Sequence, residues 1–414
     1  MLAFPWRPVL LLLSGNLIGA VVGGIFFITA SRLFTLQEMG RYVVAISLHW
    51  IAFGLLGTGL SIATLRVARD RLLAGDTPGA AGVVALAATT GMLGGIVIAC
   101  VAFAFLSWVA IPLGVSPRVA FLAITWAGAR ALLDCVRAGL LAQQRFMRAA
   151  ILSGFTAFSG LFVLVLAVST REMTVERLLE THAAGLLIGA FASIALLGPL
   201  VREGVRQAGS RELFAYARWP ALSEGTRLLQ VNLGAPLLAL VSGAGQAGIF
   251  GLGRYPAYLF DVVAVSLYQY WLSQAVQVKT AARMREYLVP QFKVAGLLGL
   301  ATLVGALLAL PVLPLLGDAF GSVRPLFFLC AVDFAIVLLV RPIESAYHGL
   351  GRPRLELVQR GVTLQVLAIS ALVLARRWGA LGMVGAHIIA SVVSLACGAL
   401  LIHRALAGTA REAA

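Results

Sequence analysis

The chain is a succession of long apolar stretches separated by short polar turns. A helix of about 20 apolar residues can cross the hydrocarbon core of a bilayer, so each stretch predicts one transmembrane span. The pattern predicts an all-α polytopic membrane protein with about twelve spans, because no polar stretch is long enough for a soluble domain. The predicted spans are residues 9–33, 41–64, 81–109, 118–141, 149–169, 181–200, 214–241, 247–273, 288–316, 325–348, 357–375 and 379–402.

Composition supports a membrane protein, because 60% of the 414 residues are hydrophobic, 12% are charged and the mean hydropathy is +0.96. The first apolar stretch begins close to Met1 and superficially resembles a secretory signal peptide. It is too long for one and leads directly into the second span, so we interpret it as a retained helix. The four cysteines have neither paired nor metal-ligand spacing. Neither a metal site nor a disulfide framework is predicted.

Basic residues lie mainly on one side of the predicted spans. With the N-terminus in the cytoplasm, 20 of the 32 lysines and arginines lie on the cytoplasmic side, 8 on the opposite side and 4 within spans. Because basic residues are enriched in cytoplasmic loops, both termini are predicted to be cytoplasmic. The net charge of +15 then reflects basic loops beside anionic lipid, and no nucleic-acid partner is predicted.

An internal repeat relates the first six spans to the last six. The turn that contains Gly40 and Tyr42 matches the turn that contains Gly248 and Phe250, at an offset of 208 residues, and the turn at Arg145 matches the turn at Arg352 at an offset of 207. Since six spans separate the copies, both copies have the same orientation in the membrane. The sequence therefore predicts two six-helix lobes, residues 1–205 and 206–414, related by a parallel pseudo-repeat.

Charged residues inside the spans are the main candidates for function. An ionised side chain in hydrocarbon costs several kcal/mol, so such residues normally face a bundle interior or a cavity. On the tenth span, four polar residues share one face at helical spacing, and the fourth, seventh and eighth spans show shorter versions of this pattern. The intramembrane arginines are Arg130, Arg227, Arg254 and Arg341, and the accompanying carboxylates are Asp134, Glu224, Asp261, Asp333 and Glu344.

Two interpretations of these charges remain open. The arginines could line a cavity and bind phosphate, because the guanidinium presents a planar fork of donors that suits phosphate oxygens. Alternatively, each arginine could be neutralised by a carboxylate on the same helix, as the spacing of Glu224 and Arg227 allows. A buried carboxylate could also carry a proton or a sodium ion, for which Asp333 is the best candidate because no arginine lies within one helical turn of it.

Glycines and prolines mark positions where spans pack closely or bend. Gly19 and Gly23 form a small-residue face on the first span, which also carries Asn16, and such a face lets another helix approach. Pro236 and Pro256 interrupt the seventh and eighth spans. Interrupted helices in corresponding elements of transporters indicate the moving gate and the binding site, so these residues are predicted to act in gating or packing.

The opening of the chain resembles a known family. The residues that carry the resemblance are Gly15–Gly19, Thr29–Phe34, Glu38–Tyr42, Leu56–Leu60 and Gln143–Phe146. In order and spacing they are similar to the Wzx-type polysaccharide flippases of the multidrug/oligosaccharidyl-lipid/polysaccharide (MOP) superfamily, most specifically over about the first 70 residues. The resemblance implies a MATE-like fold with two lobes around a cavity. It also implies transfer of undecaprenyl-pyrophosphate-linked oligosaccharide from the inner to the outer leaflet during O-antigen, capsule or exopolysaccharide synthesis.

Other functions remain open at this point. An ion-coupled multidrug exporter of the same fold would carry an acidic, aromatic-lined pocket, and a lipid II type flippase would be expected to have two further spans. A membrane glycosyltransferase or polymerase would need a large extracytoplasmic loop, but the longest such loop is only about residues 170–180. We therefore expect a monomeric, non-enzymatic transporter of the bacterial inner membrane, without a cofactor apart from a coupling proton or sodium ion, in transient contact with a polysaccharide polymerase.

Overall fold

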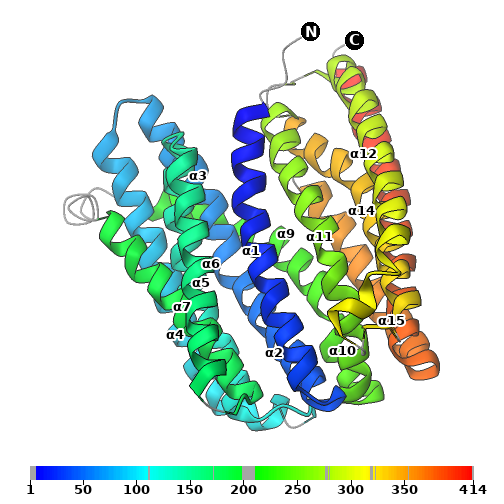
Figure 1. Cartoon of the computed structure of the whole chain (residues 1–414). Helices are drawn as coiled ribbons and strands as arrows, with labels where there is room; N and C mark the ends of the chain where they lie inside the picture. The colour runs from blue at the N-terminus through cyan, green and yellow to red at the C-terminus, as the bar shows by residue number, and fades with distance from the viewer. Residues whose placement is uncertain are drawn as a thin grey trace. The chain divides into compact units, whose positions relative to one another are not determined.

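In the computed structural model, the chain is helical, and no β-strand occurs among the residues that the structure describes. These residues are 6–110, 112–170, 172–197, 210–275, 278, 280–317, 320–321, 323–352 and 354–412. The helices are α1 (Trp6–Leu33), α2 (Leu36–Phe53), η1 (Gly54–Thr58), α3 (Gly59–Leu73), α4 (Thr77–Ala110), α5 (Pro117–Ala142), α6 (Phe146–Thr170), α7 (Val175–Leu197), α9 (Ser210–Asn232), α10 (Gly234–Ser242), α11 (Ala244–Ala275), α12 (Ala281–Ala309), η2 (Leu313–Leu316), α14 (Arg324–Gly349) and α15 (Arg354–Glu412) (Figure 1).

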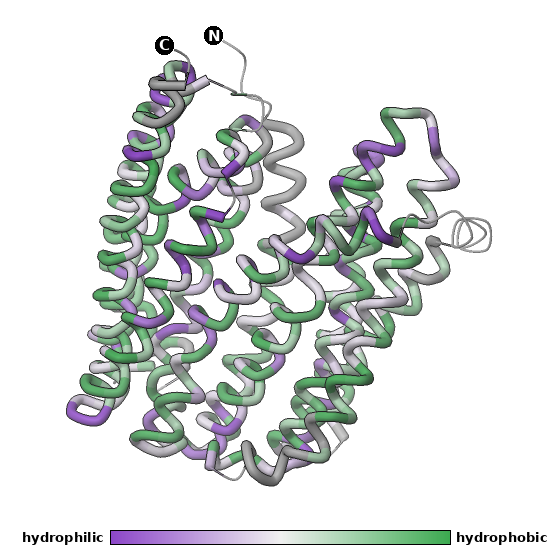
Figure 2. Tube along the Cα trace, turned by 180° about the vertical axis from the view of Figure 1, so that it is seen from behind, coloured by the Kyte–Doolittle hydropathy of each residue, from purple (hydrophilic) through white to green (hydrophobic). Residues whose placement is uncertain are grey.

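The predicted all-α membrane class is confirmed. Seven helices of the described part are long and apolar enough to cross a membrane. Most helices are hydrophobic along much of their length (Figure 2). Two predicted spans are each formed by more than one helix: α2, η1 and α3 form the second span, and α9 and α10 form the seventh. Conversely, the single helix α15 contains the last two predicted spans.

The two halves of α15 fold back on each other. Gln359 donates hydrogen bonds from Nε2 to the carbonyl and the hydroxyl of Ser394, at 3.0 and 3.1 Å. In a straight helix these residues would lie about 52 Å apart. The reversal occurs at Gly379, whose φ of 55° and ψ of −131° are non-helical. This angle pair suits glycine, which has no Cβ, and the position matches the predicted boundary between the last two spans.

Local sequence explains where several helices begin and end. Thr35 caps α2 through a capping box with Glu38, in which each side chain binds the backbone of the other residue. Ser116 caps α5, and Pro117 occupies its first turn, where a missing N–H costs nothing. The seventh span breaks between α9 and α10 after Asn232, four residues before Pro236. A proline ring clashes with the carbonyl four residues earlier, so Pro236 accounts for this break.

The chain divides into two compact units. We call Trp6–Gly248 the N-terminal unit and Ile249–Ala414 the C-terminal unit. Helices α9 and α10 belong to the N-terminal unit, where α9 packs against α2, η1 and α3. The division between units therefore falls within the first turns of α11, after Gly248. The lobe boundary predicted at residues 205 and 206 lies outside the described residues. The prediction of two six-helix lobes stays a prediction.

A reciprocal contact within the N-terminal unit supports the internal repeat. A Cβ at Gly40 on α2 would meet the carbonyl group of Ala244 on α11, and a Cβ at Gly248 would meet the carbonyl group of Leu36. Residues 36 and 244, and residues 40 and 248, are both related by the offset of 208. Each copy therefore contacts the other through equivalent residues, as a local twofold axis requires.

One turn of the N-terminal unit has the same local geometry as one turn of the C-terminal unit. After α5, the amide of Arg145 donates to the carbonyl of Leu140 at 2.9 Å, and Gln144 has a positive φ of 57°. After α14, the amide of Arg352 donates to the carbonyl of Tyr347 at 2.8 Å, and Gly351 has a φ of 67°. Both turns are left-handed C-terminal helix caps, in which a backbone amide donates to a carbonyl that the end of the helix leaves without a partner. The two turns are separated by the predicted offset of 207 residues.

Candidate functional site

In the N-terminal unit, Arg130 lies on α5 and forms an ion pair with Asp134 one helical turn later, with Nε 3.4 Å from Oδ2. Its guanidinium also lies over the rings of Trp50 and Phe53, at 5.4 and 5.8 Å from the ring centroids. The side chain of Arg130 is 30% exposed. A guanidinium held by one carboxylate and two aromatic faces keeps donors that can reach a ligand.

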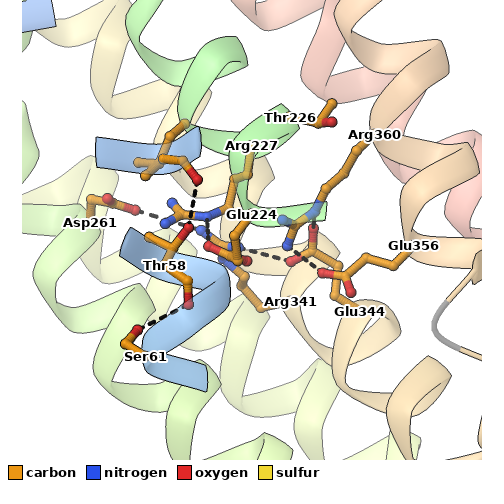
Figure 3. A network of polar contacts seen from close by, with 12 residues as sticks. Thr58, Ser61, Glu224, Thr226, Arg227, Asp261, Arg341, Glu344, Glu356 and Arg360 are labelled. Carbon is orange, nitrogen blue, oxygen red and sulfur yellow. Dashed lines mark hydrogen bonds and ion pairs between the residues drawn. The ribbon is translucent and has the colours of Figure 1, made fainter. Parts of the chain in front are cut away.

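The second arginine of this unit lies on α9. Arg227 Nε donates to Glu224 at 2.7 Å, three residues earlier on the same helix, and the arginine side chain is 19% exposed (Figure 3). The sequence spacing had allowed this pair. Both of the predicted site arginines in the N-terminal unit are thus paired within their own helices and remain partly accessible.

In the C-terminal unit, Arg254 forms an ion pair across helices. Arg254 on α11 donates to Asp333 on α14 at 3.3 Å, and the hydroxyl of Ser391 on α15 donates to the other oxygen of Asp333 at 2.6 Å. Arg254 is 4% exposed and lies among the rings of Phe250, Tyr258 and Phe334. Asp333, which the sequence presented as remote from any arginine, is therefore the centre of a three-helix ionic contact.

A larger cluster lies elsewhere in the same unit (Figure 3). Arg341 Nη1 donates to Glu344 at 2.8 Å, and its Nη2 lies 3.9 Å from Asp261 on α11. Glu344 also accepts from Arg360 on α15 at 3.3 Å, and Arg360 pairs with Glu356. Arg341 is 6% exposed. The cluster joins α11, α14 and α15, and the side chains that Figure 3 labels from these helices point toward one another.

Sequence reasoning missed part of this cluster. Arg360 lies near the start of the predicted eleventh span and was not among the predicted intramembrane arginines, yet the structure buries it together with Glu356. The i,i+4 spacing of Glu356 and Arg360 was a signal that could have identified the pair. At the end of the cluster, His348 Nε2 lies 2.8 Å from Glu356, which explains the fourth polar position of the stripe on the tenth span.

An aromatic stack in the N-terminal unit was also missed. Four rings stack one on the next in the order Phe26, His182, Trp126 and His49. The distances between the centroids of successive rings are 3.8, 4.8 and 4.2 Å. The hydroxyl of Tyr42 lies 2.9 Å from His182 Nε2. The stack joins α1, α2, α5 and α7, and its members are too far apart in sequence for any local spacing to show it.

The predicted glycine and proline positions have mixed outcomes. No atom in the described part of the chain lies within 4 Å of a Cβ built at Gly19 or Gly23, so the close helix approach predicted there is not found. Close approaches occur instead at glycines of α2, η1 and α3. The side chain of Asn16 lies outside the described part. Pro236 breaks its span, whereas α11 continues through Pro256.

Among the described residues, no group of histidine, cysteine and acidic side chains could hold a metal ion. The seven interior charges of the C-terminal unit nevertheless comprise one more acid than bases: Arg254, Arg341 and Arg360 against Asp261, Asp333, Glu344 and Glu356. An acidic excess in a buried cluster favours a proton or a cation over an anion.

Comparison with solved structures identifies the fold. An outward-facing multidrug resistance MATE transporter of the MOP superfamily superposes with a TM-score of 0.72 at 15% sequence identity, covering 98% of this chain and 97% of the transporter. The chain has the fold of MATE transporters. A Vibrio cholerae MATE transporter, VcmN, gives a TM-score of 0.73 at 16% identity over 97% and 96% of the two chains. A MOP superfamily transporter from Pyrococcus furiosus gives 0.71 at 15% identity over 96% of each.

The Pyrococcus furiosus protein is described as having a binding pocket of reverse polarity that suggests a different function. No protein-family model matches this chain, and no curated protein is significantly similar in sequence. These likenesses confirm the predicted MATE-like fold. At 15–16% identity they do not select a substrate.

Proposed function

We propose that this protein flips an undecaprenyl-pyrophosphate-linked oligosaccharide from the inner to the outer leaflet of the bacterial cytoplasmic membrane by alternating access. The observation that carries the proposal is the partial exposure of Arg130 and Arg227, whose guanidinium groups suit pyrophosphate oxygens. The fold and the resemblance at the start of the chain support a transporter of this superfamily. Arg254 and Arg341, the other predicted contacts, are largely enclosed by ion pairs and act as structural charges in this proposal.

The test is complementation of polysaccharide export by variants at the two exposed arginines. Replacing either Arg130 or Arg227 by Ala should abolish export at normal protein abundance, and replacement by Lys should cause partial loss, because Lys keeps the charge without the bidentate fork. Arg118→Ala is the control, since Arg118 forms an exposed pair with Glu180 at a helix end. Full export by both Ala variants at normal abundance would contradict the proposal.

A second candidate is an ion-coupled multidrug exporter, which the acidic excess of the C-terminal cluster favours. In that case Arg130→Ala would leave transport of an organic cation intact, whereas Asp261→Asn would reduce it. Measuring both variants with an organic cation and with polysaccharide export separates the two functions.

The proposed cycle also assigns a topology and partners. Both termini are placed in the cytoplasm, the protein acts as a monomer, and the flipped product is delivered to a polysaccharide polymerase. A cysteine at Ala208 should be protected from an impermeant reagent in intact cells and should react in inverted vesicles. Reaction in intact cells would reverse the topology.

A further inference from the structure

A π-helical turn interrupts the second span of the N-terminal unit. Helices α2 and α3 and the turn η1 between them form a continuous span of 38 residues, Leu36–Leu73. The residues of η1 are Gly54–Thr58, and the flanking residues Phe53 and Gly59 have ordinary helical dihedral angles. Single π-helical turns inside α-helices are rare in proteins, and those that occur often lie at functional sites.

Two hydroxyl groups bind carbonyls in and beside this turn. Thr58 Oγ1 donates to the carbonyl of Gly54 at 2.9 Å, and Ser61 Oγ donates to the carbonyl of Thr58 at 2.9 Å (Figure 3). A π-turn weakens the regular pairing of carbonyls with amides four residues later, and side-chain hydroxyls can supply the missing donors. The hydroxyls therefore stabilise the wide form of the turn.

Three glycines in and beside the turn allow it to approach two neighbouring helices closely. A Cβ at Gly54 would meet Leu228 of α9 at 2.8 Å, and a Cβ at Gly59 would meet Ala221 of the same helix. A Cβ at Gly57 would meet Ala131 of α5 at 2.9 Å. Helix α9 thus contacts the turn at both of its ends, and α5 contacts it in the middle.

The two contacted helices carry the exposed arginines. Ala131 follows Arg130 on α5, and Leu228 follows Arg227 on α9. The guanidinium of Arg130 also lies over Phe53, the residue directly before the turn. On each of these two helices, the turn therefore contacts the residue that follows the arginine.

We propose that the turn Gly54–Thr58 is a conformational switch that interconverts between the π-helical and α-helical forms and thereby moves Arg227 relative to Arg130. Conversion to the α form changes the register between α2 and α3 by about one residue, which is about 100° of rotation and about 1.5 Å of rise. Helix α9 cannot keep its contacts with both Gly54 and Gly59 during such a rotation. The switch gives the proposed transport cycle a moving part, and only its purpose rests on that proposed function.

The test measures distances in purified protein without substrate. Spin labels at Leu65→Cys on α3 and Leu93→Cys on α4, both exposed positions, report the rotation of α3 by electron–electron double resonance. The four native cysteines are replaced by Ala in this background. We expect two distance populations, and we expect Thr58→Val to reduce the π-form population about fivefold, as loss of one hydrogen bond implies.

Thr64→Val is the matched control, because Thr64 makes the same type of bond to the carbonyl four residues earlier, at 2.7 Å, outside the turn. It should leave the populations unchanged. Deletion of Leu55, whose side chain is exposed, should leave only the α form. A single distance that Thr58→Val does not change, or an equal response to Thr64→Val, would overturn the switch. Since the assay needs no lipid-linked substrate, it can succeed even if the export proposal fails.

Discussion

The N-terminal and C-terminal units both pair arginines with carboxylates, but they do so in different ways. In the N-terminal unit, Arg130 and Arg227 each bind an acid on their own helix and stay partly exposed. In the C-terminal unit, Arg254 and Arg341 are almost fully buried. Arg254 binds Asp333 on another helix, and Arg341 binds Glu344 on its own helix, but Glu344 also accepts a hydrogen bond from Arg360 on α15. A pair within one helix fixes no other element, whereas a pair across helices holds two elements together. The same residue types are thus partly exposed in one unit and buried in the other.

The largest effect is expected from breaking the buried pair of the C-terminal unit. Asp333→Leu leaves the Arg254 charge buried without its partner and should lower the free energy of unfolding by about 3–5 kcal/mol. The double variant Arg254→Leu and Asp333→Leu should recover most of this loss, because the unpaired charge is gone. Thermal unfolding of purified protein and its abundance in membranes measure both effects.

The matched variant in the N-terminal unit is Asp134→Leu. Arg130 is 30% exposed, so the loss should be clearly smaller than the loss caused by Asp333→Leu. Equal destabilisation by Asp134→Leu and Asp333→Leu would remove the contrast between the units.

A smaller effect tests the reciprocal contact that supports the repeat. Gly40→Ala places a methyl group against the backbone carbonyl of Ala244, which cannot move as a flexible side chain would. Overpacking of this kind should cost about 1–3 kcal/mol. Gly245→Ala, next to the contact but with no atom within 4 Å of its Cβ, should be neutral or slightly stabilising. Thermal unfolding measures both, and a neutral Gly40→Ala would show that the two helices do not approach as closely as described.

Sequence predicts those features that depend on local spacing. The spans follow from the length of the apolar stretches, and the pairs Arg130–Asp134 and Glu224–Arg227 follow from residues three or four positions apart. The contact between Arg254 and Asp333 joins residues 79 positions apart, so only the packing of α11 on α14 brings them together. Helix packing likewise decides which glycines lie at close approaches, and for this reason the sequence favoured Gly19 and Gly23 over Gly40 and Gly57.

The π-turn was invisible for a different reason. The stretch Leu56–Leu60 had served as part of a family resemblance, and its glycines are compatible with α-helix as well as with a wider turn. In the structure, the π form coincides with two hydroxyl donors and with close contacts to α5 and α9. These contacts depend on three separate parts of the chain. Local pattern therefore located the segment without showing its conformation.

The smallest expected effect concerns the two matching turns. Gln144 and Gly351 occupy equivalent left-handed positions, yet only glycine adopts a positive φ without a steric cost from Cβ. Gln144→Gly should therefore stabilise the protein by about 1 kcal/mol through relief of the backbone strain. Part of this gain is offset, because glycine makes the unfolded chain more flexible and so favours unfolding. Gly351→Gln should destabilise it by a similar amount. Thermal unfolding of the two single variants and of the double variant measures both effects.

If the turns are equivalent, as the shared hydrogen bonds indicate, the effects should be opposite in sign and should nearly cancel in the double variant. A destabilising Gln144→Gly would mean that the glutamine side chain makes a contact that offsets its backbone cost, and the turns would then be equivalent in backbone only.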